Sequence, residues 1–266
     1  MLWRRRAGPA SGPDTGRDVG ADVPRPLLAA SLAVIGDVHG RDDLLETLLS
    51  RLAALPDAAQ MRVICVGDMV DRGPDSAAVL RRLHALETRP APFASLTCLM
   101  GNHDRMLLDF IQDPAGTGMR WLQYGGAETL LSFGLSSDRM DRSEGDAAHR
   151  LVTLAQGLAG AMGPELHDWL AARPLYWTEA SLWVTHAGAD PRHSPAVQGA
   201  REFLWGGPRF YDTPRLDGLW VAHGHKIVQT PVLEPGRIAV DTGAWRTGRL
   251  TAAVIQGEGD VVFHTT

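Results

Sequence analysis

Short apolar runs that end in glycine and then in polar residues recur along the first part of the chain. The runs are residues 32–35, 63–66 and 96–100, and each is closed by a glycine followed by Asp or Asn. Runs of this kind are typical of buried strands. The residues that follow them are expected at the carboxyl edge of a sheet, which is where open α/β sheets place their ligands.

Helical periodicity follows each of these three runs. Leucines at positions 44, 45, 48, 49, 52 and 55 recur at spacings of 3 and 4, which predicts a helix over 42–55. Pro74-Asp75-Ser76 opens a second helix with apolar positions at 79, 80, 83 and 86. A third helix is expected to carry Met106, Leu107, Phe110 and Ile111 on one face. The alternation of strand and helix predicts a mainly parallel sheet covered by helices.

The second half of the chain changes character twice. Residues 117–173 have helical signals and no strand signal, so we expect a helical insertion beside the site. Strands are then predicted at 175–178 and 182–185, as a hairpin around Glu179-Ala180, and at 219–222 and 238–240. Residues 250–255 and 261–264 are expected to close the chain as an antiparallel pair.

Composition narrows the class of protein. The chain has 266 residues, of which 44% are hydrophobic and 21% charged, with a net charge of -5. These values predict a soluble globular protein. The acidic balance gives no sign of a nucleic-acid surface, and no apolar stretch approaches the roughly 20 residues of a membrane span. We therefore expect no nucleic-acid partner and no membrane partner.

The start of the chain differs from the rest. Residues 1–26 are rich in Gly, Pro, Asp and Ala, so we predict a disordered leader and a single domain over 27–266. Arg4-Arg5-Arg6 is not followed by the apolar core of a secretory signal. The two cysteines, Cys65 and Cys98, fall inside predicted strands and are expected to be buried apolar residues. A reducing cytoplasm fits this pattern.

Polar residues at the predicted strand ends form two sets. The first set is Asp37, His39, Asp68, Asn102 and His103, and the second is His186, His223, His225 and Asp241. Carboxylate, imidazole and amide groups are ligands that divalent transition metals accept. Two such sets favour a two-metal site, whose ions lie about 3.5–4 Å apart and must share a ligand. Asp68 is the candidate for the shared ligand.

Five motifs in a fixed order carry a family resemblance. They are Gly-Asp-Val-His-Gly at 36–40, Gly-Asp-Met-Val-Asp-Arg-Gly at 67–73, Gly-Asn-His-Asp at 101–104, His-Ala-Gly at 186–188 and Gly-His at 224–225. These motifs resemble the metallophosphoesterases, and more narrowly the bacterial and phage branch of the serine/threonine phosphoprotein phosphatases. The resemblance covers the chain from about Leu32 to the end. It implies the calcineurin-like α/β fold, in which layered mixed β-sheets are flanked by helices.

The resemblance also implies a role for each residue. Asp37 and His39 would bind the first metal, Asp68 would bridge, and the second metal would be bound by Asn102, His186 and His225. The metals would be two divalent ions, manganese by resemblance, with iron or zinc as alternatives. A metal-bridging hydroxide would be the nucleophile. His103 would be the general acid, Asp71 would orient it, and Arg72, together with Asn102, would contact the substrate.

Two positions depart from the family pattern. Asp104 stands where relatives usually carry Glu, and Gly207 stands where they carry a second phosphate-binding arginine two residues after a tryptophan. We expect little consequence from Asp104, which is not a ligand. Arg209 or Arg201 is the expected substitute for the missing arginine.

Three functions are consistent with these motifs. The first hypothesis is a serine/threonine protein phosphatase acting on phosphoproteins. The alternative keeps the chemistry and changes the substrate to a phosphorylated small molecule, as in a bis(5'-nucleosyl)-tetraphosphatase or another nucleotide phosphohydrolase. A further alternative is a weakly active regulatory binding protein of the same fold, for which the missing arginine is the support.

Overall fold

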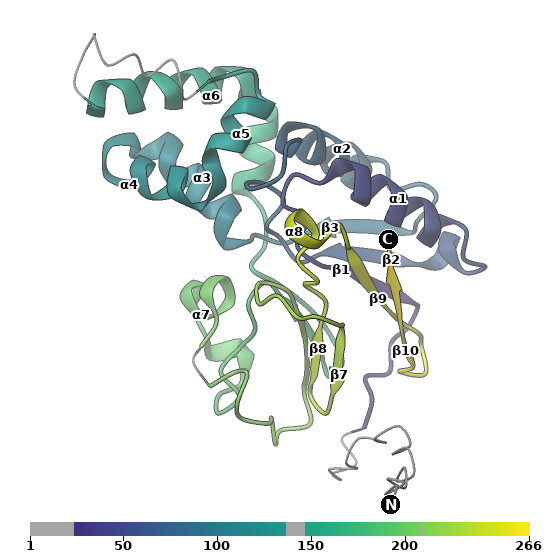
Figure 1. Cartoon of the computed structure of the whole chain (residues 1–266). Helices are drawn as coiled ribbons and strands as arrows, with labels where there is room; N and C mark the ends of the chain where they lie inside the picture. Colours follow the sequence, from purple (N-terminus) through teal and green to yellow (C-terminus); the bar gives the residue numbers. More distant parts are fainter. Residues whose placement is uncertain (1–23, 137–146, 208) are drawn as a thin grey trace, which may run out of the picture.

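The computed structural model describes residues 24–136, 147–207 and 209–266 of the chain. The leader predicted at 1–26 lies outside the described residues except for its last three positions. The fold class predicted from sequence is confirmed, because the described residues form two mixed β-sheets with helices around them (Figure 1).

Each sheet has five strands. The first sheet has the order β10-β9-β1-β2-β3 and the second the order β4-β5-β6-β8-β7. Strands β1, β2 and β3 are parallel, as are β5, β6 and β8, while the other neighbours are antiparallel. The strands of the first sheet are β1 (Leu32–Ile35), β2 (Arg62–Cys65), β3 (Ser95–Cys98), β9 (Thr251–Ile255) and β10 (Val261–Thr265). Those of the second sheet are β4 (Tyr176–Glu179), β5 (Leu182–Thr185), β6 (Trp220–His223), β7 (Val232–Glu234) and β8 (Arg237–Ala239).

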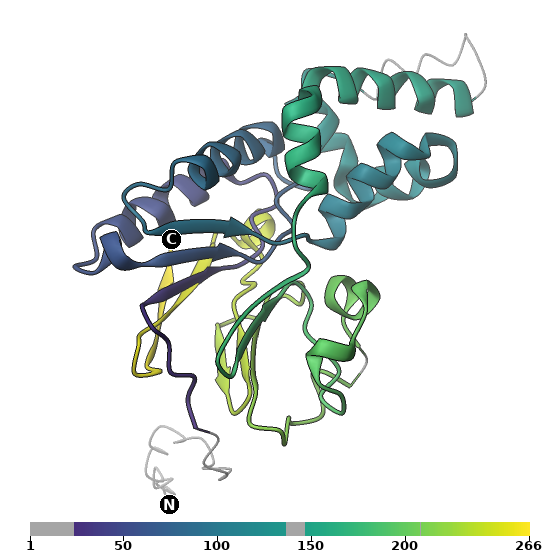
Figure 2. The same ribbon diagram turned by 180° about the vertical axis from the view of Figure 1, so that it is seen from behind.

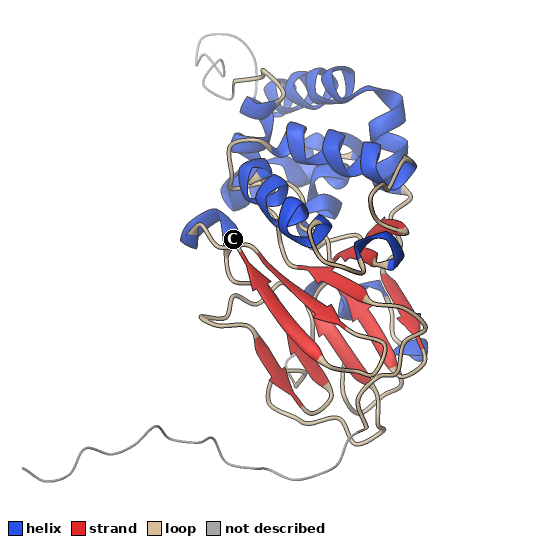
Figure 3. Cartoon of the chain, turned by 90° about the vertical axis from the view of Figure 1, so that its right-hand side faces the viewer, coloured by secondary structure: helices blue, strands red, loops and turns tan. Residues whose placement is uncertain are grey.

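Helices lie on the outside of the sheets and beyond one of their edges. The α-helices are α1 (Asp42–Ala53), α2 (Ser76–Thr88), α3 (Asn102–Gln112), α4 (Pro114–Trp121), α5 (Ala127–Ser132), α6 (Ala147–Ala171), α7 (Ala200–Trp205) and α8 (Ala244–Thr247). Helices α1 and α2 cover the first sheet, whereas α3 to α6 gather above the strands, as Figure 3 shows. The view from behind in Figure 2 places α7 beside the second sheet.

Successive side chains of the central strand β1 point into two different hydrophobic clusters. Leu32 and Val34 of β1 face the second sheet, where they share a cluster with Val184 of β5. Ala33 and Ile35 point the other way, into a cluster formed with α1 and α2. Every residue of β1 is buried, as expected of a strand with a packed layer on each face.

The structure follows the sequence predictions closely, with one strand that the sequence did not reveal. The predicted hairpin is β4 and β5, and the predicted closing pair is β9 and β10. Strand β7 has no counterpart among the predicted strands. The helical signals within 117–173 include α6, whose two helical parts meet at a kink at Gly163, where φ is 75° and Pro164 follows. Cys65 and Cys98 are buried and free, on neighbouring positions of β2 and β3.

Among the helices in the described part of the chain, none is long and apolar enough to cross a membrane.

The core between the two sheets should contribute strongly to stability. Leu182 is fully buried in this core. We expect Leu182→Ala to lower the free energy of unfolding by about 2–5 kcal/mol, because it removes apolar contacts and leaves a cavity. Urea denaturation followed by circular dichroism measures this change. Leu216→Ala is the control, since Leu216 is 93% exposed and its truncation should change the free energy by less than about 0.5 kcal/mol. Equal effects of the two variants would contradict the layered core.

Candidate metal centre

The carboxyl ends of the parallel strands deliver the predicted residues to one place. Asp37 follows β1, Asp68 follows β2, and Asn102 begins α3 just after β3. From the second sheet, His186 directly follows β5 and His225 lies two residues after β6. These five side chains are buried or half-buried, so the two sheets meet at a polar centre with little access to water.

The backbone at this centre is unusual. His39, Asp68, Asp71, Arg72 and His225 all have positive φ, between 45° and 72°. Non-glycine residues adopt this region rarely, and it persists where the surrounding structure holds it in place. The loops are also close together, because a Cβ on Gly101 would lie 2.1 Å from the backbone nitrogen of Asp68. The tight turns therefore set the direction of the ligand side chains.

Two groups of side chains are close enough to hold metal ions, and Asp68 belongs to both. One group is His39, Asp68 and His103, and the other is Asp68, His186 and His225. Asp68 Oδ2 lies 3.4 Å from His39 Nε2, and Asp68 Oδ1 lies 3.4 Å from His186 Nε2. The carboxylate of Asp68 thus has one oxygen toward each group, which is the arrangement that a bridging ligand requires.

The amide of Asn102 completes the second group. Its Oδ1 lies 2.8 Å from His186 Nε2 and 2.9 Å from His225 Nδ1. The other ring nitrogen of His186, Nδ1, donates its N–H to the carbonyl of Val66. In the neutral ring Nε2 therefore carries a lone pair. Lone pairs from His186, Asn102 and Asp68 therefore converge on one point, where only a cation would relieve their mutual repulsion.

The first group has the same design. His39 donates from Nδ1 to the carbonyl of Val70 at 2.8 Å, which leaves a lone pair on Nε2, the atom that lies 3.4 Å from Asp68 Oδ2. A hydrogen bond from the non-ligating nitrogen to a carbonyl fixes the orientation of a metal-binding imidazole. The residues present thus fit two divalent ions, and they form a His and Asp metal site of the kind found in binuclear metallophosphoesterases.

Burial keeps the imidazoles in their metal-binding form. It lowers the pKa of His39 to about 3 and that of His186 to about 4, and it also lowers the pKa of His225. Burial alone would raise the pKa of Asp68, but contact with His186, His103 and His39 outweighs it and lowers that pKa. The rings are therefore neutral and Asp68 is ionised near neutral pH.

Asp37 contacts the second group through the backbone of His225. The N–H of His225 donates to both of its carboxylate oxygens, at 3.1 and 3.0 Å. Burial raises the pKa of Asp37 well above its ordinary value, and the nearby carboxylates of Asp241 and Asp68 raise it further. Carboxylates gathered in this way need positive charge between them to ionise together.

His103, Asp71 and Arg72 form a hydrogen-bonded set next to the candidate metal ligands. His103 donates from Nδ1 to Asp71 Oδ2 at 2.7 Å. Burial opposes the charged ring of His103, but the carboxylates of Asp68 and Asp71 outweigh this and raise the pKa of His103 above its usual value. Arg72 donates from Nη1 to His39 Nε2 at 3.1 Å, and its Nη2 lies 2.9 Å from His103 Nε2. The guanidinium therefore stands between the two histidines.

The helical insertion holds Asp71 in place, which the sequence did not indicate. Trp121 donates from Nε1 to both oxygens of Asp71, at 3.1 and 3.0 Å, and Thr129 donates to Asp71 Oδ1 at 2.7 Å. The backbone N–H of Arg72 donates to the carbonyl of Gly125. Neither Trp121 nor Thr129 belongs to a motif or a strand end, so only the tertiary contacts reveal them.

Asp104 holds two backbone segments of the centre together. Its carboxylate is fully buried and accepts hydrogen bonds from the N–H groups of Gly101 and Met69. These bonds tie the start of α3 to the loop that carries Asp68. The shorter side chain at this position therefore still reaches its backbone partners.

The remaining predicted residues lie farther from the ligands. Arg209 is exposed, and among the described residues its side chain makes no hydrogen bond or ion pair with the centre. Arg201 lines a pocket beside Trp205. His223 is buried against Phe210, with ring centroids 4.7 Å apart, and its Nε2 has no hydrogen-bond partner within the described ranges. A role for Arg209 in substrate binding stays a prediction.

Comparison with known proteins gives similarities of two kinds. The chain is 44% identical over 166 residues to a symmetrical bis(5'-nucleosyl)-tetraphosphatase of Acidovorax sp. (strain JS42), which covers 61% of this chain and 45% of that protein. A protein of the same name from Janthinobacterium sp. (strain Marseille) is 27% identical over 82% of this chain and 90% of its own length. Serine/threonine-protein phosphatase 2 of Escherichia coli (strain K12) is 39% identical over 93 residues, 35% of this chain and 37% of that protein.

The chain spans about half the length of the first curated relatives that it matches. Among solved structures, a candidate diadenosine tetraphosphatase superimposes with a TM-score of 0.59 at 21% identity, over 90% of this chain and 95% of that one. At this identity the superposition supports the fold alone.

The family follows from the sequence as well as from the fold. The profile of the calcineurin-like phosphoesterases matches residues 30–227, which contain all the strand-end residues that meet at the centre. The match covers more than half of the chain, and the two packed mixed sheets agree with it. The chain therefore belongs to the calcineurin-like phosphoesterase family.

Proposed function

We propose that this protein hydrolyses dinucleoside polyphosphates in the manner of a symmetrical bis(5'-nucleosyl)-tetraphosphatase. The observation that carries the hydrolytic part is the carboxylate of Asp68, which faces two ligand groups beside the His103 and Asp71 pair. The substrate class is supported by the relatives with this name, one of which aligns over 90% of its length. These similarities favour the alternative of the sequence analysis over the first hypothesis.

Two divalent ions are part of this proposal. Asp37, His39 and Asp68 would hold one ion, and the second would be held by Asp68, Asn102, His186 and His225. When bound, the ions supply a water acidic enough to attack near neutral pH, and they neutralise charge on the phosphoryl oxygens. Manganese is the proposed metal, with iron and zinc compatible with the same nitrogen and oxygen ligands.

The chain's own residues bind the phosphoryl group and move a proton. Arg72 presents two N–H groups that match the spacing of phosphate oxygens. His103 is held through Nδ1 by Asp71, and its Nε2, 2.9 Å from Arg72 Nη2, would donate a proton to the leaving oxygen when the ring is protonated. As the oxygen of the attacking hydroxide bonds to phosphorus, the P–O bond to the leaving phosphate breaks and its electron pair stays on the leaving oxygen. That oxygen takes the proton from His103. Cleavage at the centre of a tetraphosphate yields two nucleoside diphosphates.

A phosphoprotein substrate is the second candidate. The similarity to serine/threonine-protein phosphatase 2 of Escherichia coli supports it, although that alignment covers 35% of the chain. Both candidates use the same ligands, so the choice between them depends on how each leaving group binds.

Substrate preference is the first test. With manganese present, we expect kcat/KM for diadenosine tetraphosphate to exceed that for a panel of phosphoserine and phosphothreonine peptides by at least about 100-fold, and ADP to be the sole nucleotide product. Chromatography of nucleotides and a phosphate release assay measure the two reactions. A preference for the peptides would overturn the proposed substrate, and release of AMP with ATP would overturn symmetrical cleavage.

Asp68 should control both metals. We expect Asp68→Asn to lower the manganese content of the purified protein from two ions per chain toward less than one, because the neutral amide replaces the shared anion. Activity should fall by more than the roughly 10–100-fold that the loss of an outer partner of a metal ligand costs. Elemental analysis measures the content, and Asp212→Asn, at an exposed aspartate, is the control. A variant that keeps two ions would show that Asp68 does not bridge.

The alkaline side of the pH profile should report His103. Its pKa is raised above the ordinary value, and a general acid works only while protonated, so kcat should fall as pH rises through that pKa. Asp71→Asn removes a negative charge that favours the protonated ring, so we expect the fall in kcat to occur at lower pH. His103→Ala should abolish this limb and lower kcat by about 10²–10⁴-fold.

Metal analysis of the His103→Ala variant separates the two roles open to this residue, since His103 also lies in one of the groups able to hold a metal. Retention of both ions is expected of a general acid. Loss of one ion would identify His103 as a ligand. His193→Ala, at an exposed histidine, is the control.

A further inference from the structure

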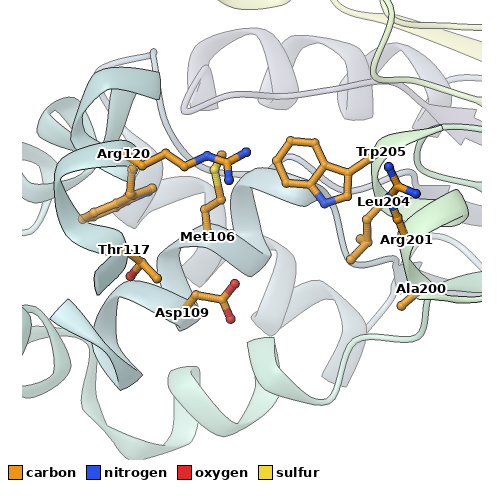
Figure 4. Close-up of a pocket in the computed structure, with 9 residues that line it drawn as sticks. Met106, Asp109, Thr117, Arg120, Ala200, Arg201, Leu204 and Trp205 are labelled. Atoms are coloured by element: carbon orange, nitrogen blue, oxygen red, sulfur yellow. The ribbon is translucent and has the colours of Figure 1, made fainter. Parts of the chain in front are cut away.

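A pocket of about 600 Å³ adjoins the centre on one side (Figure 4). It lies between the helices α3 and α4 and the helix α7, and its volume falls within the roughly 300–1,000 Å³ of small-molecule sites. Its lining residues are Met106, Asp109, Thr117, Arg120, Trp121, Ala200, Arg201, Leu204 and Trp205. None of the proposed metal ligands lines it.

A row of rings and one guanidinium connects this pocket to the centre at both ends. Tyr124 lies with its ring centroid 6.4 Å from that of His103. The guanidinium carbon of Arg120 lies 5.9 Å from the Tyr124 ring and 5.5 Å from the Trp205 ring. The Trp205 ring lies 6.4 Å from that of His225. The row therefore runs from the proposed general acid to a proposed ligand of the second metal.

The two large aromatic rings of this row are open to solvent. Tyr124 is 48% exposed and Trp205 is 40% exposed. An exposed indole presents a flat face on which a planar group can stack. Arg120 already lies over this ring from the side of α4, and Figure 4 shows Arg201 near it on the side of α7. Trp205 therefore lines the same pocket as two guanidinium groups, one from α4 and one from α7.

The polar groups of the pocket suit a ligand with phosphate oxygens at one end and amino groups at the other. Arg120 and Arg201 offer guanidinium groups, which bind phosphate oxygens. Asp109 offers a carboxylate that accepts hydrogen bonds from amino groups, and one of its oxygens is engaged by Arg105 at 3.0 Å. A flat ring with amino groups, joined to phosphates, combines these features, and a nucleoside diphosphate is such a molecule.

We propose that this pocket binds the leaving nucleotide, with its base stacked on Trp205 and its phosphates near Arg120 and Arg201. The inference rests on the proposed function and adds the place of the leaving group. The leaving oxygen must lie near His103, and the row of side chains starts there with Tyr124. Trp121 reinforces the connection, because it lines the pocket and donates its N–H to Asp71. The pocket and the proton donor are thus held by one side chain.

Equilibrium binding to the manganese-loaded protein tests the inference without relying on turnover. We expect ADP to bind at least about 10-fold more tightly than pyrophosphate, which lacks the nucleoside. Trp205→Ala should weaken ADP binding by about 10-fold, the scale of one lost stacking contact with a base, and should weaken pyrophosphate binding less than twofold. Trp205→Phe, which keeps an aromatic face, should restore most of the ADP affinity.

Arginine variants provide a matched pair. Arg201→Ala should weaken the binding of ADP, whereas Arg89→Ala, at an exposed arginine that follows α2 and does not line the pocket, should leave it unchanged. Thermal unfolding checks that each variant is folded. Equal losses for ADP and pyrophosphate in Trp205→Ala, or a loss confined to a phosphoserine peptide, would overturn the pocket as a nucleotide site.

The two proposals can fail separately. A protein that binds ADP through Trp205 but does not cleave diadenosine tetraphosphate would keep this inference and overturn the proposed function. A protein that cleaves the tetraphosphate with a Trp205→Ala variant of unchanged ADP affinity would do the reverse.

Discussion

The burial of one carboxylate, that of Asp68, is the constraint on which the rest of the centre depends. A charge removed from water is costly unless partners surround it, and Asp68 is 2% exposed. His39 and His186, from different strand ends, lie 3.4 Å from its two oxygens, and the N–H of His103, from a third, donates to it. Both sheets must therefore pack closely enough to bring their loops within reach of a single side chain. The core between the sheets and the polar centre at their edge are parts of the same requirement.

Much of the fold could be predicted because its strands are short, apolar and closed by glycine. The run at 32–35 is β1, and the hairpin around Glu179 is β4 and β5. Side-chain periodicity could not reveal β7, an edge strand whose residues are half-buried or exposed. The kink of α6 at Gly163 does have a signal in the sequence, because a proline such as Pro164 disfavours the helical conformation at the residue before it.

Some features of the candidate site could likewise be predicted from the sequence, and others could not. Residues that follow a strand directly, such as Asp68 and His186, could be placed at one edge from the sequence, because parallel strands end together. The conformations that aim them could not, since positive φ at His39 or Arg72 results from tight loop packing and has no signature in residue type. Trp205 precedes the departure at Gly207 in the sequence, and only its place beside Arg120 and His225 relates it to a ligand.

The hydrogen bonds from Trp121 and Thr129 to Asp71 have a consequence for how the molecule could lose activity. The partners of these bonds are 50 and 58 positions apart in the chain, and both donors belong to helices beyond the sheets. If these helices detached while the sheets stayed folded, the proposed metal ligands would keep their places, but His103, the proposed proton donor, would lose its orientation. Unfolding of these helices alone would thus stop the proposed reaction well before the whole chain unfolded. Inactivation by heat would then precede the loss of the β-sheets.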